Sequence, residues 1–295
     1  MKQFYGYESD LRRSQWTLTA SYRITQKLRI KLSKMGKSKG HHFIPVFLLR
    51  EFTNEHGKVW VFRKGTQDVL DVNPRNIAKE THYNSTYEDG RRNNSLEIEL
   101  DRAIENRYAR VVKDTIKRVR DKSPLDLRSK KNVFRDLAYI QFCRSKSIKD
   151  GFGDQRKDTG ITKNALQNDY VDMMWNILND LDKGILPIAW HDLDPLNLGV
   201  MCIKNPNKTF VIGDIPLVKV SKTEMYFSIA HDIMIYWGRE NDEPERKVIP
   251  SGNGNIRRLN EMILRDSTLI AGKSRSVISD LKNCKLAGSE PRLTD

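Results

Sequence analysis

The order of helical and strand-like patterns is the feature that most constrains the fold of this chain. Strand-like runs gather in a front segment and a back segment, and long amphipathic helical patterns stand together between them. In a doubly wound α/β protein, strands and helices would alternate along the chain. The grouped order therefore predicts an α+β fold, with a mixed front of short helices and strands, a helical middle, an antiparallel β-rich back and a long C-terminal helix.

The helical middle rests on apolar residues that recur with the spacing of an α-helix. Residues 94–120 are the clearest case, because their apolar side chains fall on one face. Further helices are predicted at residues 128–148 and 164–183, with a mobile loop at residues 151–160 between them, and a closing helix at residues 256–281. The apolar residues of the first helix are Leu96, Leu100, Ile104, Tyr108, Val111, Val112, Ile116 and Val119.

Short runs of β-branched and aromatic residues predict strands on both sides of the helices. In front, residues 59–62 and 69–72 form an expected antiparallel pair. A short helix is expected to begin at Pro45 and to end at the turn of residues 54–57. In the back segment, strands are predicted at residues 185–190, 198–203, 210–212, 225–229 and 233–237.

Positive charge is concentrated at the N-terminus. The formal net charge is +14, and residues 1–39 hold ten Lys or Arg against two acidic residues, which is eight of that surplus. They show no helical or strand period, so we expect a basic leader outside the core, followed by a single α+β domain at residues 40–290. A start of translation at Met35 is an equally good interpretation.

Cysteine usage and hydropathy argue against several classes of protein. The three cysteines, Cys143, Cys202 and Cys284, lie far apart and form no CxxC pair, which argues against a disulfide framework or a thiolate zinc site. No run approaches the roughly 20 apolar residues of a membrane span. The N-terminus lacks the apolar segment of a secretory signal. We therefore expect a cytoplasmic protein.

Two adjacent histidines, His41 and His42, stand directly before the helix expected at Pro45. Neutral imidazole serves both as a metal ligand and as a general base near neutral pH. The alternative is that one histidine caps the helix and the other is solvated. His42, Asn73 and His82 also follow the residue order of HNH nucleases, but the 31 positions that separate the first two exceed that compact motif.

Three polar residues fall on helix faces that are otherwise apolar. Gln141 and Arg144 do so in the helix at residues 128–148, and Glu97 does so in the helix before it. An isolated ion in the interior is costly. Arg144 should therefore pair with a carboxylate such as Glu97 or Glu105, or line a cleft.

Asp214 follows the apolar run at residues 210–212. Ends of strands commonly present carboxylates for metal or acid–base chemistry, and Gly213 would let a ligand or another backbone come close. Asp is also a common turn residue, so a structural role is the alternative. A similar cluster at a strand exit, where Asp-Pro also predicts a turn, consists of His191, Asp192 and Asp194.

Several of these residues form a pattern along most of the chain. Its members are His41, His42, Phe43, Ile44, Pro45, Leu49, Phe52, the strand at residues 59–62, Glu97, Leu100, Glu105, Gln141, Arg144, Asp214, Pro216 and Asn260. With this pattern, residues 40 to about 277 resemble the DUF4238 family of uncharacterised bacterial proteins. The resemblance implies a shared fold and a common polar cluster, and it implies no activity. The family pattern has Ser or Thr before the Asp and Asn after it, whereas this chain has Gly213 and Ile215.

The polar residues of this pattern are the ones that stand out on physical grounds, so we expect them to converge in one cleft. A histidine with carboxylates can bind Mg²⁺ or Mn²⁺, and Arg144 can stabilise negative charge on a phosphate. The hypothesis is a metal-dependent nuclease that acts on DNA or RNA; the alternative is a non-enzymatic nucleic-acid or protein-binding module whose polar cluster is structural. The expected catalytic residues are His42, Glu105, Gln141, Arg144 and Asp214, and the expected metal ligands are His41, His42, Glu97 and Asp214.

Deletion of residues 1–34 is expected to leave a folded protein, because this segment has no pattern with which to join a core. The same deletion should weaken binding to nonspecific duplex DNA. Each lost phosphate contact removes about 0.9 from the slope of log affinity against log salt. Thermal unfolding and binding at several salt concentrations check both expectations. A midpoint lowered by many degrees, or an unchanged salt slope, would contradict them.

Overall fold

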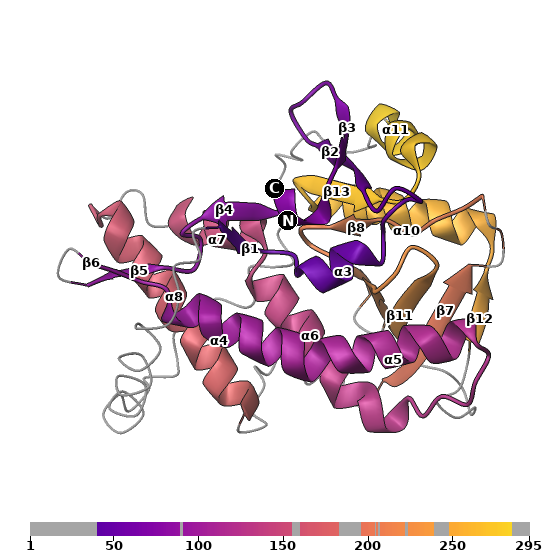
Figure 1. The fold of residues 1–295 in the computed structure, drawn as a ribbon, viewed down its shortest axis with the longest axis horizontal. Coiled ribbons are helices and arrows are strands. Elements are labelled where there is room, and N and C mark those ends of the chain that lie inside the picture. The colour runs from indigo at the N-terminus through magenta and orange to yellow at the C-terminus, as the bar shows by residue number, and fades with distance from the viewer. Residues whose placement is uncertain are drawn as a thin grey trace, which may run out of the picture.

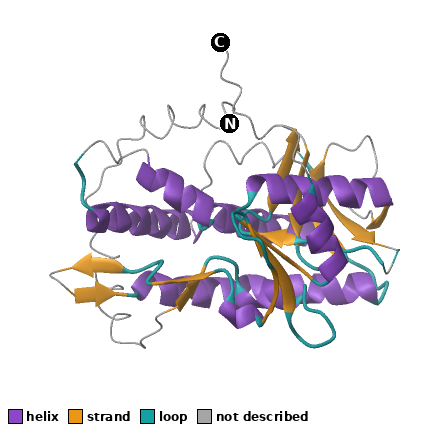
Figure 2. Ribbon diagram, turned by 90° about the horizontal axis from the view of Figure 1, so that it is seen from above, coloured by secondary structure: helices purple, strands orange, loops and turns teal. Residues whose placement is uncertain are grey.

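The computed structural model describes residues 40–88, 91–154, 160–182, 196–203, 205, 207–221, 224–238 and 248–284. Helices pack against small, largely antiparallel sheets, as Figure 1 and Figure 2 show, and this arrangement confirms the predicted α+β fold. The leader, the strand predicted at residues 185–190 and the His191 cluster lie outside the described residues. Within the described residues, no helix is both long enough and apolar enough to cross a bilayer.

The helix predicted at residues 94–120 is present and runs across the molecule (Figure 1). It consists of α4 (Ser95–Ala103), a π-helical turn (Ile104–Tyr108) and α5 (Ala109–Arg120). Its apolar residues repeat every four positions, a spacing that would drift around an α-helix of about 3.6 residues per turn. The wider π turn offsets part of this drift. All six repeating side chains are therefore buried, namely Leu96, Leu100, Ile104, Tyr108, Val112 and Ile116.

The second predicted helix is interrupted. It consists of α6 (Lys131–Cys143) and α7 (Lys146–Asp154) instead of one continuous helix. The hydroxyl of Ser145 accepts a hydrogen bond from the backbone N–H of Ile148 at 3.4 Å, so Ser145 caps the new helix. The mobile loop predicted at residues 151–160 is also corrected, because its beginning belongs to α7.

Short strands and the third predicted helix form one end of the molecule, on the left of Figure 1. The helix, α8 (Lys163–Asp182), packs against α4, α6 and α7. Two antiparallel strands, β5 (Thr86–Glu88) and β6 (Arg91–Asn93), form a pair, and β5 lies beside α8. Another antiparallel pair, β1 (Gly40–His42) with β4 (Lys79–Thr81), places both histidines on a strand that the sequence analysis did not predict.

The back segment forms a five-stranded sheet with the order β12-β7-β11-β10-β9. Neighbouring strands are antiparallel except β12 and β7, which are parallel. The strands predicted at residues 198–203, 225–229 and 233–237 correspond to β7, β10 and β11, whereas β9 and β12 were not predicted. The bounds are β7 (Asn197–Ile203), β9 (Leu217–Ser221), β10 (Glu224–Ser228), β11 (Ile233–Gly238) and β12 (Val248–Ser251).

A second sheet, with the order β3-β2-β13-β8, joins the front of the chain to its end. The predicted front pair is present as β2 (Val59–Arg63) and β3 (Val69–Val72). β13 (Leu269–Gly272) lies between β2 and β8 (Ile212–Gly213) and is antiparallel to both. The short helix predicted after Pro45 is α3 (Val46–Arg50).

The single long C-terminal helix was a wrong prediction. The chain forms α10 (Asn253–Asp266), then β13, then α11 (Arg275–Asn283). The four residues of β13 are all buried in the sheet. A short apolar run of this kind cannot be told from a buried helix segment by periodicity alone.

Gly213 is expected to be irreplaceable, because β8 passes very close to the end of α10. A Cβ atom at this position would lie 2.0 Å from Oγ of Ser267 and 2.9 Å from Cγ2 of Ile263. Gly213→Ala should therefore lower the free energy of unfolding by about 1–3 kcal/mol. The matched control is Gly254→Ala, since a Cβ there meets no atom within 4 Å. Urea unfolding compares them, and equal stabilities would contradict the close approach.

Candidate functional site

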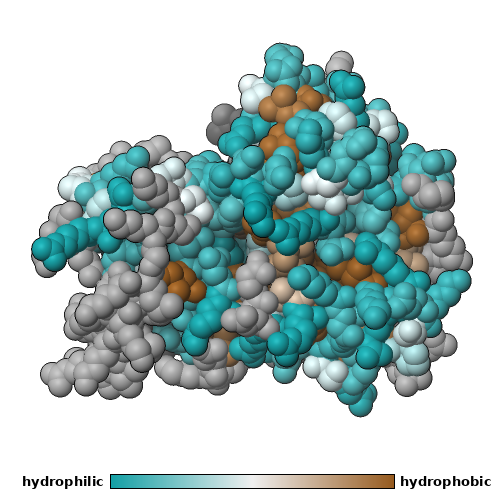
Figure 3. All heavy atoms as spheres, viewed as in Figure 1, coloured by the Kyte–Doolittle hydropathy of each residue, from teal (hydrophilic) through white to brown (hydrophobic). Residues whose placement is uncertain are grey.

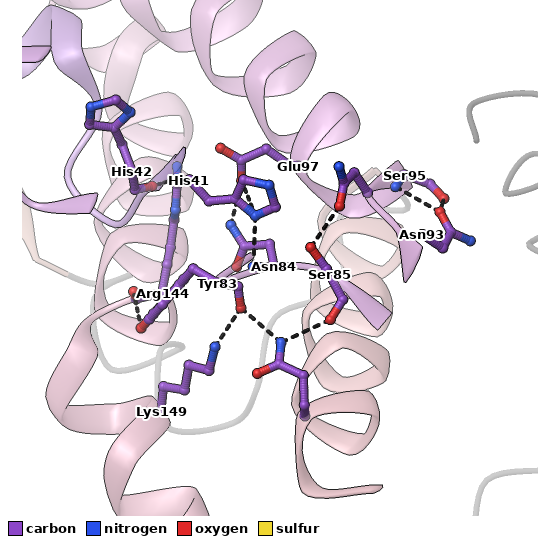
Figure 4. A network of polar contacts seen from close by, with 12 residues as sticks. His41, His42, Tyr83, Asn84, Ser85, Asn93, Ser95, Glu97, Arg144 and Lys149 are labelled. Carbon is purple, nitrogen blue, oxygen red and sulfur yellow. Dashed lines mark hydrogen bonds and ion pairs between the residues drawn. The ribbon is translucent and has the colours of Figure 1, made fainter. Parts of the chain in front are cut away.

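Strand β1 carries the two adjacent histidines to opposite sides. Successive side chains of a strand point in opposite directions. His41 is accordingly 0% exposed, while His42 is half-buried. Figure 4 shows the His42 ring turned away from the residues that surround His41. The histidine pair is thus divided into one interior and one surface residue.

His41 belongs to a buried polar network with Asn84 and Glu97 (Figure 4). The backbone N–H of Asn84 donates to Nδ1 of His41 at 2.9 Å, and Nδ2 of Asn84 donates to Oε2 of Glu97 at 2.5 Å. Oε2 also lies 3.9 Å from Nδ1 of His41. Because Nδ1 accepts the backbone hydrogen bond, it carries no proton, and its lone pair is used in this structural contact.

Glu97 is a carboxyl group in an apolar setting, only 2% exposed. Burial raises its pKa above the ordinary value of 4.5, and three weaker effects oppose this rise. These are the positive charge of Arg144, the hydrogen bond from Asn84 and a hydrogen bond from the backbone of His42. Burial therefore favours the neutral form of Glu97, and the surrounding donors favour the ionised form.

Arg144 follows the last residue of α6 and connects that helix to strand β1. Its guanidinium donates to the carbonyl oxygen of His42, and its own carbonyl accepts a hydrogen bond from the Tyr83 hydroxyl at 3.1 Å. The side chain is 2% exposed. Its charge lowers the pKa of Glu97, although the two groups form no direct ion pair. The predicted partnership of Arg144 and Glu97 is therefore a charge interaction within one network.

Lys149 and Gln167, which the sequence analysis did not single out, extend the network. Lys149 Nζ donates to the carbonyl of Tyr83 and lies 3.8 Å from the centre of the Tyr83 ring. Burial lowers the pKa of Lys149 to about 8. Nε2 of Gln167 donates to the carbonyl oxygens of Tyr83 at 2.8 Å and of Ser85 at 3.0 Å. Both side chains thus hold the irregular segment that carries Asn84.

Gln141 and Glu105 add little to the network that can be described. Gln141 is fully buried, and neither polar atom of its amide has a hydrogen-bond partner among the described residues. Glu105 lies in the π turn, and its side chain is outside the described part of the chain. The predicted residues that the network gathers are therefore His41, Glu97 and Arg144.

Asp214 lies at the junction of α10 and β13, where it is fully buried. Its carboxylate accepts hydrogen bonds from the backbone N–H of Thr268 at 2.8 Å, from the Thr268 hydroxyl at 2.7 Å and from the N–H of Leu269 at 3.1 Å. None of these partners belongs to the network around His41. The structure does not bring Asp214 into that network, and the carboxylate holds the chain where the helix gives way to the strand.

Two further predicted motif residues stabilise local structure. In α10, Oδ1 of Asn260 accepts from the backbone N–H of Val211 at 3.0 Å, and its Nδ2 donates to the carbonyl of Thr209 at 2.9 Å. Asn73 caps the short 3-10 turn Pro74–Asn76 with its side chain. These contacts account for both amides without a ligand.

The predicted metal ligands do not form one set. His41 and Glu97 are neighbours, His42 faces the other side of β1, and Asp214 contacts different elements. Across the described ranges, no group of three His, Cys, Asp or Glu side chains is placed to hold a metal ion. A site for Mg²⁺ or Mn²⁺ stays a prediction.

The His42 ring lies in an open depression of about 380 Å³. Apart from His42, the residues that line it are Val46, Phe47, Arg50, Arg75 and Lys113. Nε2 of His42 is 3.1 Å from the carbonyl oxygen of Arg75. Burial lowers the pKa of His42 below its ordinary value of 6.5, and the nearby charges of Lys79 and Arg144 lower it further. We call this set of residues the His42 depression.

The three cations of the His42 depression have no carboxylate partner. Arg50, Arg75 and Lys113 are exposed, and among the described residues none of them forms an ion pair. They come from α3, the 3-10 turn and α5, and meet only in the folded chain. Figure 3 shows that hydrophilic side chains cover most of the face on which α3 and α5 lie.

Asp214→Ala is expected to destabilise the protein strongly, because it leaves the backbone N–H groups of Thr268 and Leu269 and the Thr268 hydroxyl without this acceptor. At about 1–3 kcal/mol for each such donor, the loss should be about 3 kcal/mol or more. Asp214→Asn keeps an acceptor oxygen and should lose less. Urea unfolding with and without Mg²⁺ checks this, with Asp68→Ala as an exposed control. A neutral Asp214→Ala, together with stabilisation of the wild type by Mg²⁺, would assign Asp214 to a metal cleft instead.

Comparison with known proteins gives a family and no activity. A model of the family described as "Protein of unknown function (DUF4238)" matches residues 40–280. No curated protein and no solved structure matches the chain. The match covers most of the sequence and begins at strand β1, so it includes both the buried network and the His42 depression. This chain belongs to the DUF4238 family.

Proposed function

We propose that this protein binds nucleic acid, and that the His42 depression holds its phosphate groups. The observation that carries the proposal is the meeting of three exposed cations, Arg50, Arg75 and Lys113, without carboxylate partners. Cations near carboxylates are already neutralised, whereas unpaired ones repel each other and favour an anion between them. A phosphodiester supplies this charge and several hydrogen-bond acceptors.

The row of cations continues along α5, which favours a polymer over a single anion. Arg110, Lys113 and Lys117 are exposed and lie three and four residues apart, on one face of the helix. None of them forms an ion pair within the described residues. At about 1.5 Å per residue, the row spans about 10 Å along the helix, and Lys113, which lines the depression, lies between its ends. Successive phosphates of one strand can follow such a row.

A membrane surface is a less favourable partner for this face. Proteins that lie on membranes insert large apolar side chains beside their basic residues. In the described part of the chain, the large hydrophobic residues with high exposure are Leu70 and Ile161, and neither lines the His42 depression. Val46 and Phe47 line it but are half-buried and buried. The net charge of +14, like the positive charge of the depression, attracts a polyanion.

The buried network supports binding by fixing the position of His42. Arg144, Glu97 and His41 are almost fully buried and bonded to one another or to the backbone. A structural role for this network agrees with the alternative that the sequence left open. Metal-dependent hydrolysis stays a prediction, and an assay with added Mg²⁺ or Mn²⁺ tests it independently of binding.

Arg75→Gln combined with Lys113→Gln is expected to weaken binding to single-stranded RNA by about tenfold or more. The salt slope should fall by about 1.4, because each phosphate contact contributes about 0.7 on a single strand. The substitutions leave the Arg75 carbonyl beside His42 in place. Fluorescence anisotropy at several salt concentrations measures both quantities.

The matched control is Arg257→Gln combined with Arg265→Gln, which removes the same net charge from α10. Both arginines are paired with carboxylates, Glu261 and Asp266. The control should bind as the wild type does. Equal loss in both double variants would mean that only net charge matters and would contradict the proposal, as would binding of poly-glutamate in preference to RNA.

A further inference from the structure

We infer that His42 is the general base of a metal-independent RNA cleavage site, in which Nδ1 takes the proton of a ribose 2′-hydroxyl. The inference rests on the proposed function, since the phosphate must first occupy the His42 depression. It assigns to this site a reaction and a substrate class. The geometry that leads to it is the hydrogen bonding of the imidazole ring.

The backbone fixes which nitrogen of His42 is basic. Nε2 lies 3.1 Å from the carbonyl oxygen of Arg75, and a carbonyl oxygen can only accept a hydrogen bond. In the neutral ring Nε2 therefore carries the proton, and Nδ1 carries the lone pair. Within the described residues Nδ1 has no hydrogen-bond partner. A carbonyl that orients one nitrogen and leaves the other free is a common arrangement for a basic histidine.

In the neighbouring His41, by contrast, the ring nitrogen Nδ1 is engaged in a structural hydrogen bond. Nδ1 of His41 accepts the backbone N–H of Asn84, and the side chain is 0% exposed. His41 can reach no substrate. Because β1 turns alternate side chains to opposite faces, the half-buried His42 ring points away from the network around His41 (Figure 4). One strand thus separates a structural histidine from a chemically available one.

Burial and neighbouring positive charge favour the neutral form of His42. Burial lowers the pKa of the ring, and the charges of Lys79 and Arg144 lower it further. The hydrogen bond to Arg75 raises the pKa, but the net direction is downward. The neutral form is the one that can accept a proton. The titratable and charged groups around it are His41 on β1, Lys79 on β4, Arg144 after α6, Arg75 in the 3-10 turn, Arg50 on α3 and Lys113 on α5.

The reaction is an attack of RNA on its own backbone. The 2′-oxygen forms a bond to the adjacent phosphorus while its proton passes to Nδ1 of His42, and the bond from phosphorus to the 5′-oxygen breaks. The leaving oxygen takes a proton from water, and His42 returns its proton to solvent. The products are a 2′,3′-cyclic phosphate and a 5′-hydroxyl end. Arg50, Arg75 and Lys113 neutralise the charge that develops on the phosphoryl oxygens.

The test uses the full chain with EDTA and a single-stranded RNA oligonucleotide, beside the same sequence as DNA and as 2′-O-methyl RNA. The wild type should cleave RNA alone and leave a cyclic phosphate. At RNA concentrations that saturate each protein, His42→Asn should cleave RNA at least about 100-fold more slowly than the wild type, as expected for the loss of a general base. The control His56→Asn removes an exposed histidine, 73% accessible, and should cleave normally.

The pH profile gives a second readout. The rate should rise with pH and level off, because the base must be unprotonated to accept the proton. Normal cleavage by His42→Asn, cleavage of the 2′-O-methyl strand or loss of cleavage in EDTA would overturn the inference. RNA binding without cleavage would overturn it and leave the proposed function standing. Absence of binding would remove both.

Discussion

The buried charge of Arg144 is the constraint on which the site depends. A guanidinium in an apolar interior is stable only if its donors and its charge are compensated. Here the His42 carbonyl accepts one hydrogen bond, and Glu97, whose pKa the charge of Arg144 lowers against the effect of burial, lies in the same network. The bond to the carbonyl requires strand β1 to pass directly over the end of α6. That passage fixes the strand register with β4, and with it the side to which each histidine points.

Strand β1 therefore contributes both to the buried network and to the surface of the site. On the inside, Asn84 donates hydrogen bonds to His41 and Glu97. The segment that carries Asn84 is held in place by Lys149 and Gln167. On the outside, the same strand presents His42 to the depression that Arg75 and Lys113 also line. A rigid interior matters for such a surface residue, since catalytic or binding groups must be held by a well-packed neighbouring shell.

Hydrophobic periodicity correctly predicted the long elements, in which apolar residues repeat over many positions. It did not predict the short elements, in which the chain changes direction within a few residues. The helix at residues 94–120 repeats its apolar residues over six turns or more, so its existence was clear from the sequence. The break before α7 depends on the hydroxyl of Ser145, and β13 depends on the strands on either side of it. Neither contact can be recognised from the sequence pattern of the segment itself. Asp214 was noticed for the right reason, an apolar run that ends in a carboxylate, but its partners at Thr268 lie 54 residues further along the chain.

The candidate site shows the same division between local and distant information. Glu97 and Arg144 could be found because a charge on an apolar helix face is a local anomaly. The His42 depression could not be found, because its cations come from three elements and an exposed Lys or Arg is ordinary at each position taken alone. What distinguishes them is that three cations without an ion pair among the described residues line one depression, whereas exposed cations such as Lys58 and Arg120 are paired with carboxylates. Local unpaired charge, which only the fold reveals, is therefore a better guide to the binding surface than the net charge of the sequence.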